Sequence, residues 1–251
     1  METPDLDTPT AALEAQGAGP LASTTGWLGA PLPAEFYRRA ADEVAPELLG
    51  AYLAVQSPGA APRVGRIVEV EAYIGEEDAA CHAFKGLTPR TRTLYGPPGT
   101  AYVYLVYGMH ELFNVVCQPA GVPHAVLVRA VEPVRLPVVD GAALGPADME
   151  GAPGGLGHAV AAGPARPGDD RRAANGPGKL TRFLGIGRRH DGSSLTAPPI
   201  TVHAGAAPSR IVVTPRVGVA YAGRWAEAPL RYYDADSPAV SRPPKGRIGA
   251  G

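Results

Sequence analysis

Apolar runs with an alternating pattern fill residues 66–133 and constrain the fold more than any other stretch of the chain. The runs are RIVEVEAYI, AYVYLVYG, MHELFNVVCQ and HAVLVRAVEP, which begin at residues 66, 101, 109 and 124. Alternation of this kind is typical of β-strands that bury one face. Short turns between consecutive strands favour antiparallel pairing. The sequence therefore predicts one mixed α/β (α+β) domain with an antiparallel sheet at its centre.

Weaker patterns flank this central stretch. They predict a helix in 33–50 that Pro46 divides, a short strand at 51–55, a short helix at 77–82, an amphipathic helix within 176–186, two strands in 211–223 and an irregular segment at 224–234. The 32 glycines and 28 prolines exclude a helical bundle, because these residues interrupt helices and favour irregular connections.

The chain ends are poor in periodic apolar residues. We expect a disordered tail at 1–30, a single folded domain at 31–240 and a flexible C-terminal tail at 241–251. A Gly/Pro/Asp-rich segment at 140–172 contains no recognisable motif, and short helices or a long surface excursion fit it equally well.

Charge is distributed unevenly along the chain. Residues 1–165 carry 9 basic and 18 acidic side chains, whereas 166–251 carry 14 basic and 6 acidic ones. A basic third of this kind fits a polyanion-binding face, and a solvated surface explains it equally well. The acidic N-terminus and the absence of a long apolar run predict a soluble, cytoplasmic protein with no membrane association. Cys81 and Cys117 show no metal-ligand spacing.

Glu71 is an ionisable residue within an apolar strand. Strict alternation places it on one face with Ile67, Glu69 and Tyr73, and Val68, Val70, Ala72 and Ile74 on the other. Two ordinary acids on a wet strand face explain this pattern as well as a carboxylate in a pocket does. A carboxylate beside aromatic walls, however, can activate water next to a flat, electron-poor ring.

Tyrosines follow one another along the strand at 101–108. Alternation places Tyr102 and Tyr104 on one face and Tyr107 on the other, next to Gly108 at an expected turn. Tyrosine is common in strands, so this run is compatible with sheet packing alone. A ring at the turn would be displayed rather than buried.

Three further polar residues stand out in apolar surroundings. His82 follows an acidic stretch without a partner at metal-binding spacing, and Asn114 and Arg129 lie within apolar strands. Satisfied polar groups of a strand explain them as readily as a binding site does. P-loop, GxSxG, HExxH and Rossmann patterns are all absent from the sequence.

The order of several sequence blocks resembles the alkyladenine (3-methyladenine, methylpurine) DNA glycosylase family. The blocks are VEVEAYIGEEDAACH, TPRTRT, PPGTAYVYLVYGMHELFNVV, VLVRAVEP, NGPGKL and RVGVAYAGRWAEAPLRYY, within residues 34–238. The resemblance implies a curved antiparallel sheet flanked by helices and long loops, with no metal and no organic cofactor. It also implies a monofunctional glycosylase of base excision repair, which flips a damaged purine out of duplex DNA and leaves an abasic site.

The resemblance also assigns roles to the pocket residues. Glu71 matches the carboxylate that activates the attacking water. Tyr73, His82 and Tyr104 match the walls around the flipped base, and Asn114 matches the residue that crowds the amino group of guanine. A second carboxylate is not required, because a base methylated on N3 or N7 is cationic and departs without much protonation.

The resemblance further implies a set of DNA contacts. Tyr107 matches the side chain that fills the gap left by the flipped base, and Arg129 matches a contact to the backbone of that nucleotide. Further residues fall in blocks that line the DNA: Thr88, Arg90, Met109 and Lys179. Duplex DNA with damaged purines is thus the expected partner of a monomer, and DNA would bring the protein to the nucleoid. His110 departs from the aromatic residue of vertebrate members.

Two other function classes remain open at this point. A non-catalytic protein that recognises DNA lesions would keep the pocket and Tyr107 without hydrolysing a bond. A hydrolase of free nucleosides would act without DNA and would not depend on Tyr107.

Overall fold

The computed structural model describes residues 28–134, 138–139, 142–143 and 173–241. The predicted tails lie outside this range except for their inner residues, 28–30 and 241. Most of the predicted excursion at 140–172 is also outside it.

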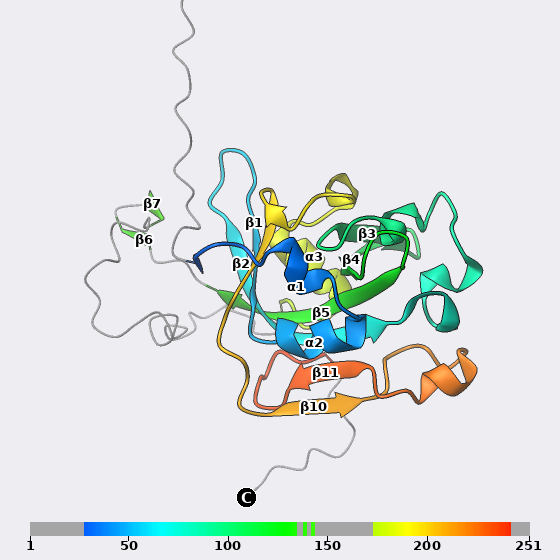
Figure 1. The fold of residues 1–251 in the computed structure, drawn as a ribbon. Helices are drawn as coiled ribbons and strands as arrows, with labels where there is room; N and C mark the ends of the chain where they lie inside the picture. Colours follow the sequence, from blue (N-terminus) through cyan, green and yellow to red (C-terminus); the bar gives the residue numbers. More distant parts are fainter. Residues whose placement is uncertain (1–27, 135–137, 140–141, 144–172, 242–251) are drawn as a thin grey trace, which may run out of the picture.

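A strongly curled antiparallel sheet of nine strands forms the centre of the protein (Figure 1). The strand order is β3-β4-β5-β2-β1-β9-β8, and β11 pairs with both β2 and β10. The strands are β1 (Tyr52–Val55), β2 (Arg63–Tyr73), β3 (Ala101–Val106), β4 (His110–Cys117), β5 (His124–Val134), β8 (Thr196–Ala197), β9 (Ile200–His203), β10 (Ile211–Thr214) and β11 (Arg231–Asp234). A separate two-stranded ribbon consists of β6 (Val138–Val139) and β7 (Ala142–Ala143). The predicted fold class is confirmed.

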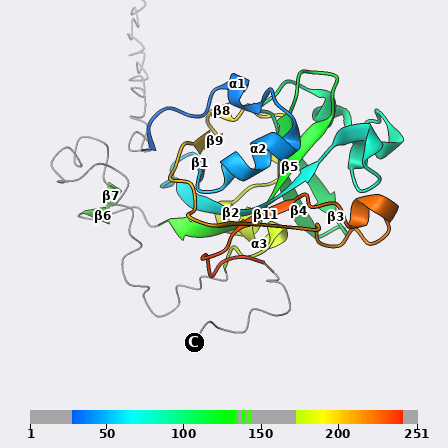
Figure 2. The same ribbon diagram turned by 60° about the horizontal axis from the view of Figure 1, so that its bottom comes forward.

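Helices are few and short. They are α1 (Ala34–Tyr37), α2 (Ala41–Leu48) and α3 (Pro177–Leu184), with 3-10 turns at Gly75–Glu77, His82–Lys85, Arg92–Tyr95, Arg188–His190 and Gly223–Ala226. The long strand β5 lies between α2 and α3 (Figures 1 and 2). Both helices contribute buried residues to the main core, including Val44 and Leu48 from α2 and Leu180 and Leu184 from α3.

The two faces of the central strands differ in composition and surroundings. Apolar residues of one face belong to the main core: Val70, Ala72, Val103, Phe113, Val115, Val126 and Val128. The other face carries the polar and aromatic residues singled out in the sequence. Because successive side chains of a strand point to opposite faces, this division follows from the alternating pattern.

Two bulges follow one another in the β2–β5 pair, one on each strand. Ile67 pairs with Val131 and Glu69 pairs with Ala130, so β2 has one extra residue there. Val70 then pairs with Val128, which makes Arg129 the extra residue of β5. Bulges redirect side chains, and the prediction that Ile67 shares a face with Glu71 is wrong for this reason. Ile67 is fully buried in the main core.

Several predicted boundaries also need correction. Pro46 does not divide a helix but lies inside α2, and the break between α1 and α2 falls at residues 38–40. The expected helix at 77–82 is replaced by the two 3-10 turns on either side of it. Only the first of the two strands expected in 211–223 forms, as β10, while the irregular segment at 224–234 contains β11.

Candidate active site

One row of residues crosses five strands on the polar face of the sheet. The register pairs Tyr102 with Asn114, Asn114 with Leu127, Leu127 with Glu71 and Glu71 with Arg231. Residues directly opposite one another across strands point to the same face. The pairing thus brings together residues that are far apart in the sequence.

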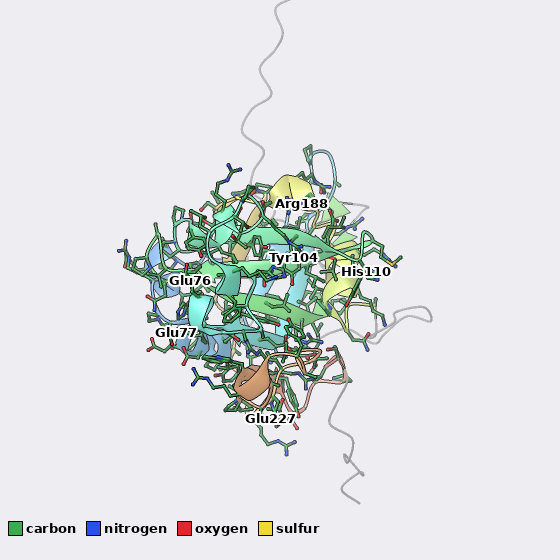
Figure 3. The ribbon with its side chains drawn as sticks, turned by 90° about the vertical axis from the view of Figure 1, so that its right-hand side faces the viewer. Glu76, Glu77, Tyr104, His110, Arg188 and Glu227 are labelled. Atoms are coloured by element: carbon green, nitrogen blue, oxygen red, sulfur yellow. The ribbon has the colours of Figure 1, made fainter. Side chains whose placement is uncertain are left out.

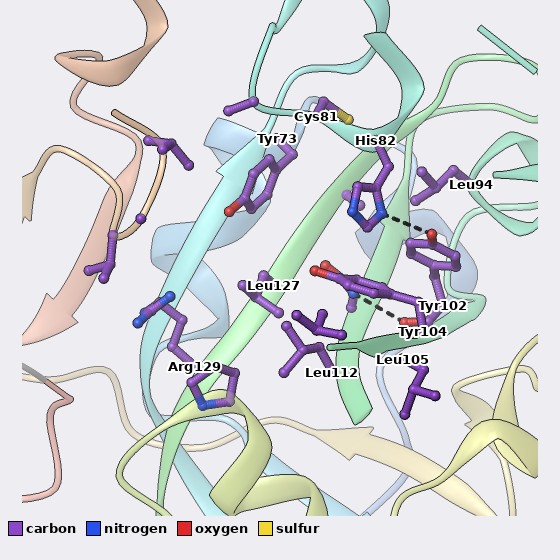
Figure 4. A pocket seen from close by; sticks show the side chains of 18 of the residues that line it. Tyr73, Cys81, His82, Leu94, Tyr102, Tyr104, Leu105, Leu112, Leu127 and Arg129 are labelled. Atoms are coloured by element: carbon purple, nitrogen blue, oxygen red, sulfur yellow. Dashed lines mark hydrogen bonds between the residues drawn. The ribbon is translucent and has the colours of Figure 1, made fainter. Parts of the chain in front are cut away.

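A cavity of about 520 Å³ lies over this row. This volume falls within the range of roughly 300–1,000 Å³ typical of small-molecule pockets. Figure 4 shows Tyr73 on one side of the cavity and His82 and Tyr104 on the other. Asn114, Arg129 and Tyr107 also line it. The residues predicted to form a pocket around Glu71 therefore meet around one cavity.

Glu71 lies directly behind the pocket wall and is fully buried. Its Oε2 atom accepts hydrogen bonds from the Tyr73 hydroxyl at 3.0 Å and the Arg129 guanidinium at 3.2 Å. Its Oε1 atom accepts one from the backbone N–H of Val217 at 2.7 Å. All three donors line the cavity. The prediction of a wet strand face is excluded, because Glu69 is fully buried as well.

Arg129 connects the two buried glutamates. Its Nε donates to Glu69 at 2.9 Å, Nη1 donates to Glu71 and Nη2 donates to the Ser241 hydroxyl at 3.3 Å. The side chain is only 8% exposed. The bulge at this residue aims the guanidinium along the polar face, where it can reach both carboxylates.

A second buried ion pair supports Tyr73 and the loop that carries Val217. Arg216 forms a bidentate pair with Asp78, and both side chains are fully buried. The Arg216 guanidinium also lies over the Tyr73 ring, 4.6 Å from its centroid. Burial, together with the neighbouring Glu71 carboxylate, raises the pKa of Tyr73 well above its ordinary value. Tyr73 therefore keeps its proton, and its hydroxyl donates a hydrogen bond to Glu71.

His82 is held at the opposite wall by two tyrosines. Its Nδ1 atom is hydrogen-bonded to the Tyr102 hydroxyl at 3.0 Å, and its ring packs against Tyr104 with centroids 4.3 Å apart. Burial, with a smaller effect from the nearby Arg90, lowers the pKa of His82 to about 4. The imidazole is therefore neutral at pH 7. Burial also raises the pKa of Tyr102 to about 12, so its phenol stays protonated.

Asn114 holds the floor of the pocket together. Its Nδ2 atom donates to the backbone carbonyl of Tyr102 at 3.2 Å, across the β3–β4 pair. The residue is only 4% exposed, so its amide is a buried polar group that faces the cavity.

Tyr107 leaves the sheet at the turn between β3 and β4. The Met109 N–H bonds to the Val106 carbonyl, and both central residues of this turn, Tyr107 and Gly108, have positive φ angles of 51° and 69°. This combination defines a type I′ turn, which usually has Asn or Gly at the first position. A tyrosine there is strained and 92% exposed. The ring is displayed at the mouth of the pocket.

The other residues predicted to contact DNA are spread around this mouth. Arg90 is exposed, lines the pocket and lies 5.9 Å from the centroid of the Tyr104 ring. Met109 is 69% exposed beside Tyr107. Lys179 is exposed at the start of α3, where it donates to Asn175, and Thr88 bonds to Thr91 in a loop. Their contacts with DNA stay predictions.

Sequence reasoning missed several residues that build the site. Asp78 looked like part of an ordinary acidic loop. Its ion-pair partner, Arg216, follows 138 residues later in the sequence. Tyr221 is 74% exposed and lines the pocket from the same loop as Val217. A signal for Arg216 and Tyr221 lay in the block RVGVAYAG, which combines an arginine and a tyrosine with a loop-like composition.

The described residues contain neither a candidate metal site nor a candidate membrane-spanning helix. Within that part of the chain, no three or more His, Cys, Asp and Glu side chains come together in a way that could hold a metal ion. In the same residues, no helix is long and apolar enough to cross a membrane.

Comparison with known proteins identifies the family. The family model described as methylpurine-DNA glycosylase matches residues 35–238. A protein of Myxococcus xanthus named "putative 3-methyladenine DNA glycosylase" is 47% identical over 219 residues, 86% of this chain and 96% of the relative. Relatives with the same name from Methanocella arvoryzae and Legionella pneumophila are 43% and 38% identical, over 86% and 84% of this chain and 98% of each relative. The chain therefore belongs to the methylpurine-DNA glycosylase family, whose members are hydrolases of N-glycosyl bonds.

Proposed function

We propose that this protein flips an alkylated or deaminated purine out of duplex DNA and hydrolyses its N-glycosidic bond with a water activated by Glu71. One observation carries this proposal: a buried carboxylate lies behind an aromatic cavity, and all three of its hydrogen-bond donors belong to the cavity wall. The base must leave the helix, since a base stacked in a duplex is out of reach of such a cavity.

The carboxylate retains capacity for the water. A carboxylate offers about four acceptor positions, and Glu71 uses three of them within the described structure, only one of these on Oε1. We assign the remaining position on Oε1 to the water. Because Glu71 is covered in the free protein, the water must enter beside Val217 and Arg129 when the nucleotide binds.

The reaction then balances without a cofactor. The water oxygen attacks C1′ of the sugar as its proton passes to Glu71, and the bond between C1′ and the purine breaks. The electron pair of that bond leaves with the base, so a methylated, cationic purine departs as a neutral molecule. A neutral purine such as hypoxanthine departs as an anion and takes a proton from solvent water. The negative carboxylate also faces the positive charge that develops on the sugar. The products are a free base and an abasic site.

The pocket walls provide recognition of the base. Tyr73 and Tyr104 offer aromatic faces, which attract a cationic ring. His82 is neutral and offers its second ring nitrogen, Nε2, for a hydrogen bond. Asn114, at the floor, would crowd the exocyclic amino group of guanine, which weakens binding of normal guanine but leaves 7-methylguanine the attraction of its positive charge to the tyrosine rings. Arg129 would lie near the backbone of the flipped nucleotide while it stays paired with Glu71.

Tyr107 would fill the gap that the flipped base leaves in the duplex. Its position at the tip of the β3–β4 turn supports this role, because the ring projects from the protein beside the cavity. Figure 3 shows Arg188 above Tyr104 and His110 to its right, with Glu76 and Glu77 to its left. We expect the phosphates to follow the side of Arg188, since like charges repel. One molecule of the protein provides this whole surface, so a monomer suffices.

Single-turnover excision of hypoxanthine and 7-methylguanine from duplex DNA tests the proposal. The wild type should release the base, and Glu71→Gln should lose activity by roughly 100-fold or more, within the range known for general bases. Glu132→Gln is the matched control, because Glu132 pairs with Arg66 in the same sheet and does not line the cavity. Its activity should equal that of the wild type.

Other results would point to other functions. Equal activity of Glu71→Gln and the wild type would refute the role of Glu71. Tight binding of lesion-containing DNA by a wild type that releases no base would favour a lesion-binding protein. Cleavage of free nucleosides that is insensitive to Tyr107→Ala would favour a nucleoside hydrolase.

A further inference from the structure

Glu69 lies behind the pocket, where it accepts four hydrogen bonds from described residues. Its Oε1 atom accepts from the Nε of Arg129 at 2.9 Å, the Nε of Arg231 at 2.8 Å and the Ser241 hydroxyl at 2.9 Å. Its Oε2 atom accepts from the backbone N–H of Ser241 at 2.6 Å. Three of these bonds end on Oε1 and one on Oε2, and of their donors only Arg129 lines the cavity. Glu69 is therefore turned away from a water in the pocket, and its burial needs another explanation.

Among the described residues, the charged side chains that contact Glu69 and Glu71 form a balanced set. Two carboxylates, Glu69 and Glu71, alternate with two guanidiniums, Arg129 and Arg231, and all four side chains are buried. Of the four, only Arg129 lines the cavity. Without Glu69, the set would carry one excess positive charge immediately behind the pocket wall. Such a charge would oppose the entry of a cation, because buried charges are weakly screened.

We propose that Glu69 is a positioning residue that holds the Arg129 guanidinium beside Glu71 and cancels its charge, so that the pocket accepts purines that carry a positive charge. This inference rests on the function proposed above and concerns its substrate class. Purines methylated on N3 or N7 carry such a charge within DNA, whereas hypoxanthine does not. Glu69 would thus set the preference between cationic and neutral damaged bases without touching either.

The same geometry predicts the opposite change in selectivity when the charge of Arg231 is removed. Arg231 lies opposite Glu71 in the pairing of β2 and β11, and its Nη2 donates to the Ser241 carbonyl at 2.7 Å. Removing its charge would leave the set with one excess negative charge. A cationic base should then bind better, relative to a neutral one, than it does in the wild type. Removing both charges restores the balance.

Equilibrium binding of two duplexes to the full-length protein tests these two opposite shifts in preference between cationic and neutral bases. One duplex carries a 2′-fluorinated 7-methylguanine nucleotide and the other a 2′-fluorinated deoxyinosine. The fluorine slows cleavage of both by destabilising the positive charge on the sugar, so that a Kd can be measured. The quantity of interest is the ratio of the two Kd values at fixed salt, because a general loss of DNA binding cancels in it.

The expected changes follow from one elementary charge roughly 10 Å from the base in a medium of effective dielectric constant about 20–40, which alters binding on the order of tenfold. Glu69→Gln should weaken binding of the cationic duplex relative to the neutral one by this factor. Arg231→Gln should strengthen it, and the double variant should return near the wild-type ratio. Glu132→Gln, which breaks an ion pair outside the cavity wall, should leave the ratio unchanged.

Several outcomes would overturn the inference. An unchanged ratio in Glu69→Gln refutes charge cancellation, as does a double variant that keeps the ratio of Glu69→Gln. If Glu69→Gln does not fold, Arg231→Gln decides the question alone, because only charge cancellation predicts a shift toward the cationic lesion. Failure of the proposed function gives a different result, namely a wild type that neither excises the two lesions nor binds them better than undamaged DNA.

Discussion

Replacement of Asp78 by Asn tests whether the buried pair with Arg216 is what holds the pocket wall in place. Asp78 accepts four hydrogen bonds, two from Arg216 and one each from the backbone N–H groups of Ile74 and Ala80. Asparagine keeps the shape of the side chain and removes the charge. The fully buried Arg216 guanidinium would then lack a counter-charge.

The size of the effect follows from this burial. Removing one partner of a buried ion pair costs about 3–5 kcal/mol, because the other charge stays behind unpaired. The total free energy of unfolding of a domain is about 5–15 kcal/mol. For a domain of this size, each kcal/mol lowers Tm by about 2–4 °C. We therefore expect Asp78→Asn to lower Tm by roughly 6–20 °C.

Thermal and urea unfolding followed by circular dichroism measure this change. The matched control is Glu47→Gln, which breaks an ion pair with Arg39 whose side chains are 53% and 36% exposed. An exposed pair contributes at most about 1 kcal/mol. A second variant, Asp78→Leu with Arg216→Met, removes both charges and should recover much of the lost stability. The reasoning is refuted if Asp78→Asn and Glu47→Gln lose equal stability.

Two further predictions concern residues at the mouth and the wall of the pocket. Tyr107→Gly should raise the free energy of unfolding by about 1 kcal/mol, because glycine adopts the positive φ of 51° without strain. The same variant should bind lesion-containing DNA more weakly, so urea unfolding and DNA titration should move in opposite directions. His82 takes up a proton near pH 6.5 when unfolded but only near pH 4 when folded. Protonation of the unfolded chain thus removes up to about 2–3 kcal/mol of stability as pH falls from 6.5 to 4. In urea unfolding at pH 7 and 4.5, His82→Gln should lose less stability on acidification than the wild type does.

The sequence predicted the sheet and the pocket face well, because alternation is a local property. Glu71 and Tyr73 do share a face and a hydrogen bond, and Tyr104 packs against His82 at the opposite wall of the cavity. The bulges escaped this reasoning. A bulge changes the pairing of two strands, and its position depends on the partner strand rather than on the residues of one strand. The prediction of which sheet face Ile67 occupies was wrong for that reason.

Errors outside the central stretch have a similar origin. Residues 231–234 form β11 because β2 and β10 pair with them on both sides. The sequence of this short segment does not indicate which strands it pairs with. Pro46 was expected to divide a helix, yet α2 continues through it. Pro46 is the sixth of the eight residues of α2, so the ring removes one hydrogen bond close to the C-terminal end of a helix that ends two residues later. Arg216 and Asp78 meet only after the chain has folded back over the sheet.

The sequence alone could not separate Glu69 from Glu71, since both lie in the same strand and on the same expected face. The structure separates them by where their hydrogen-bond donors lie among the described residues. Glu69 accepts four, from Arg129, Arg231 and twice from Ser241. Glu71 accepts three, and its donors belong to the cavity wall. A base that takes a proton from water needs a vacant acceptor position beside the substrate, and Glu71 meets this condition where Glu69 does not. The proposed division of two identical side chains into a base and a counter-charge thus rests on the partners that the fold supplies.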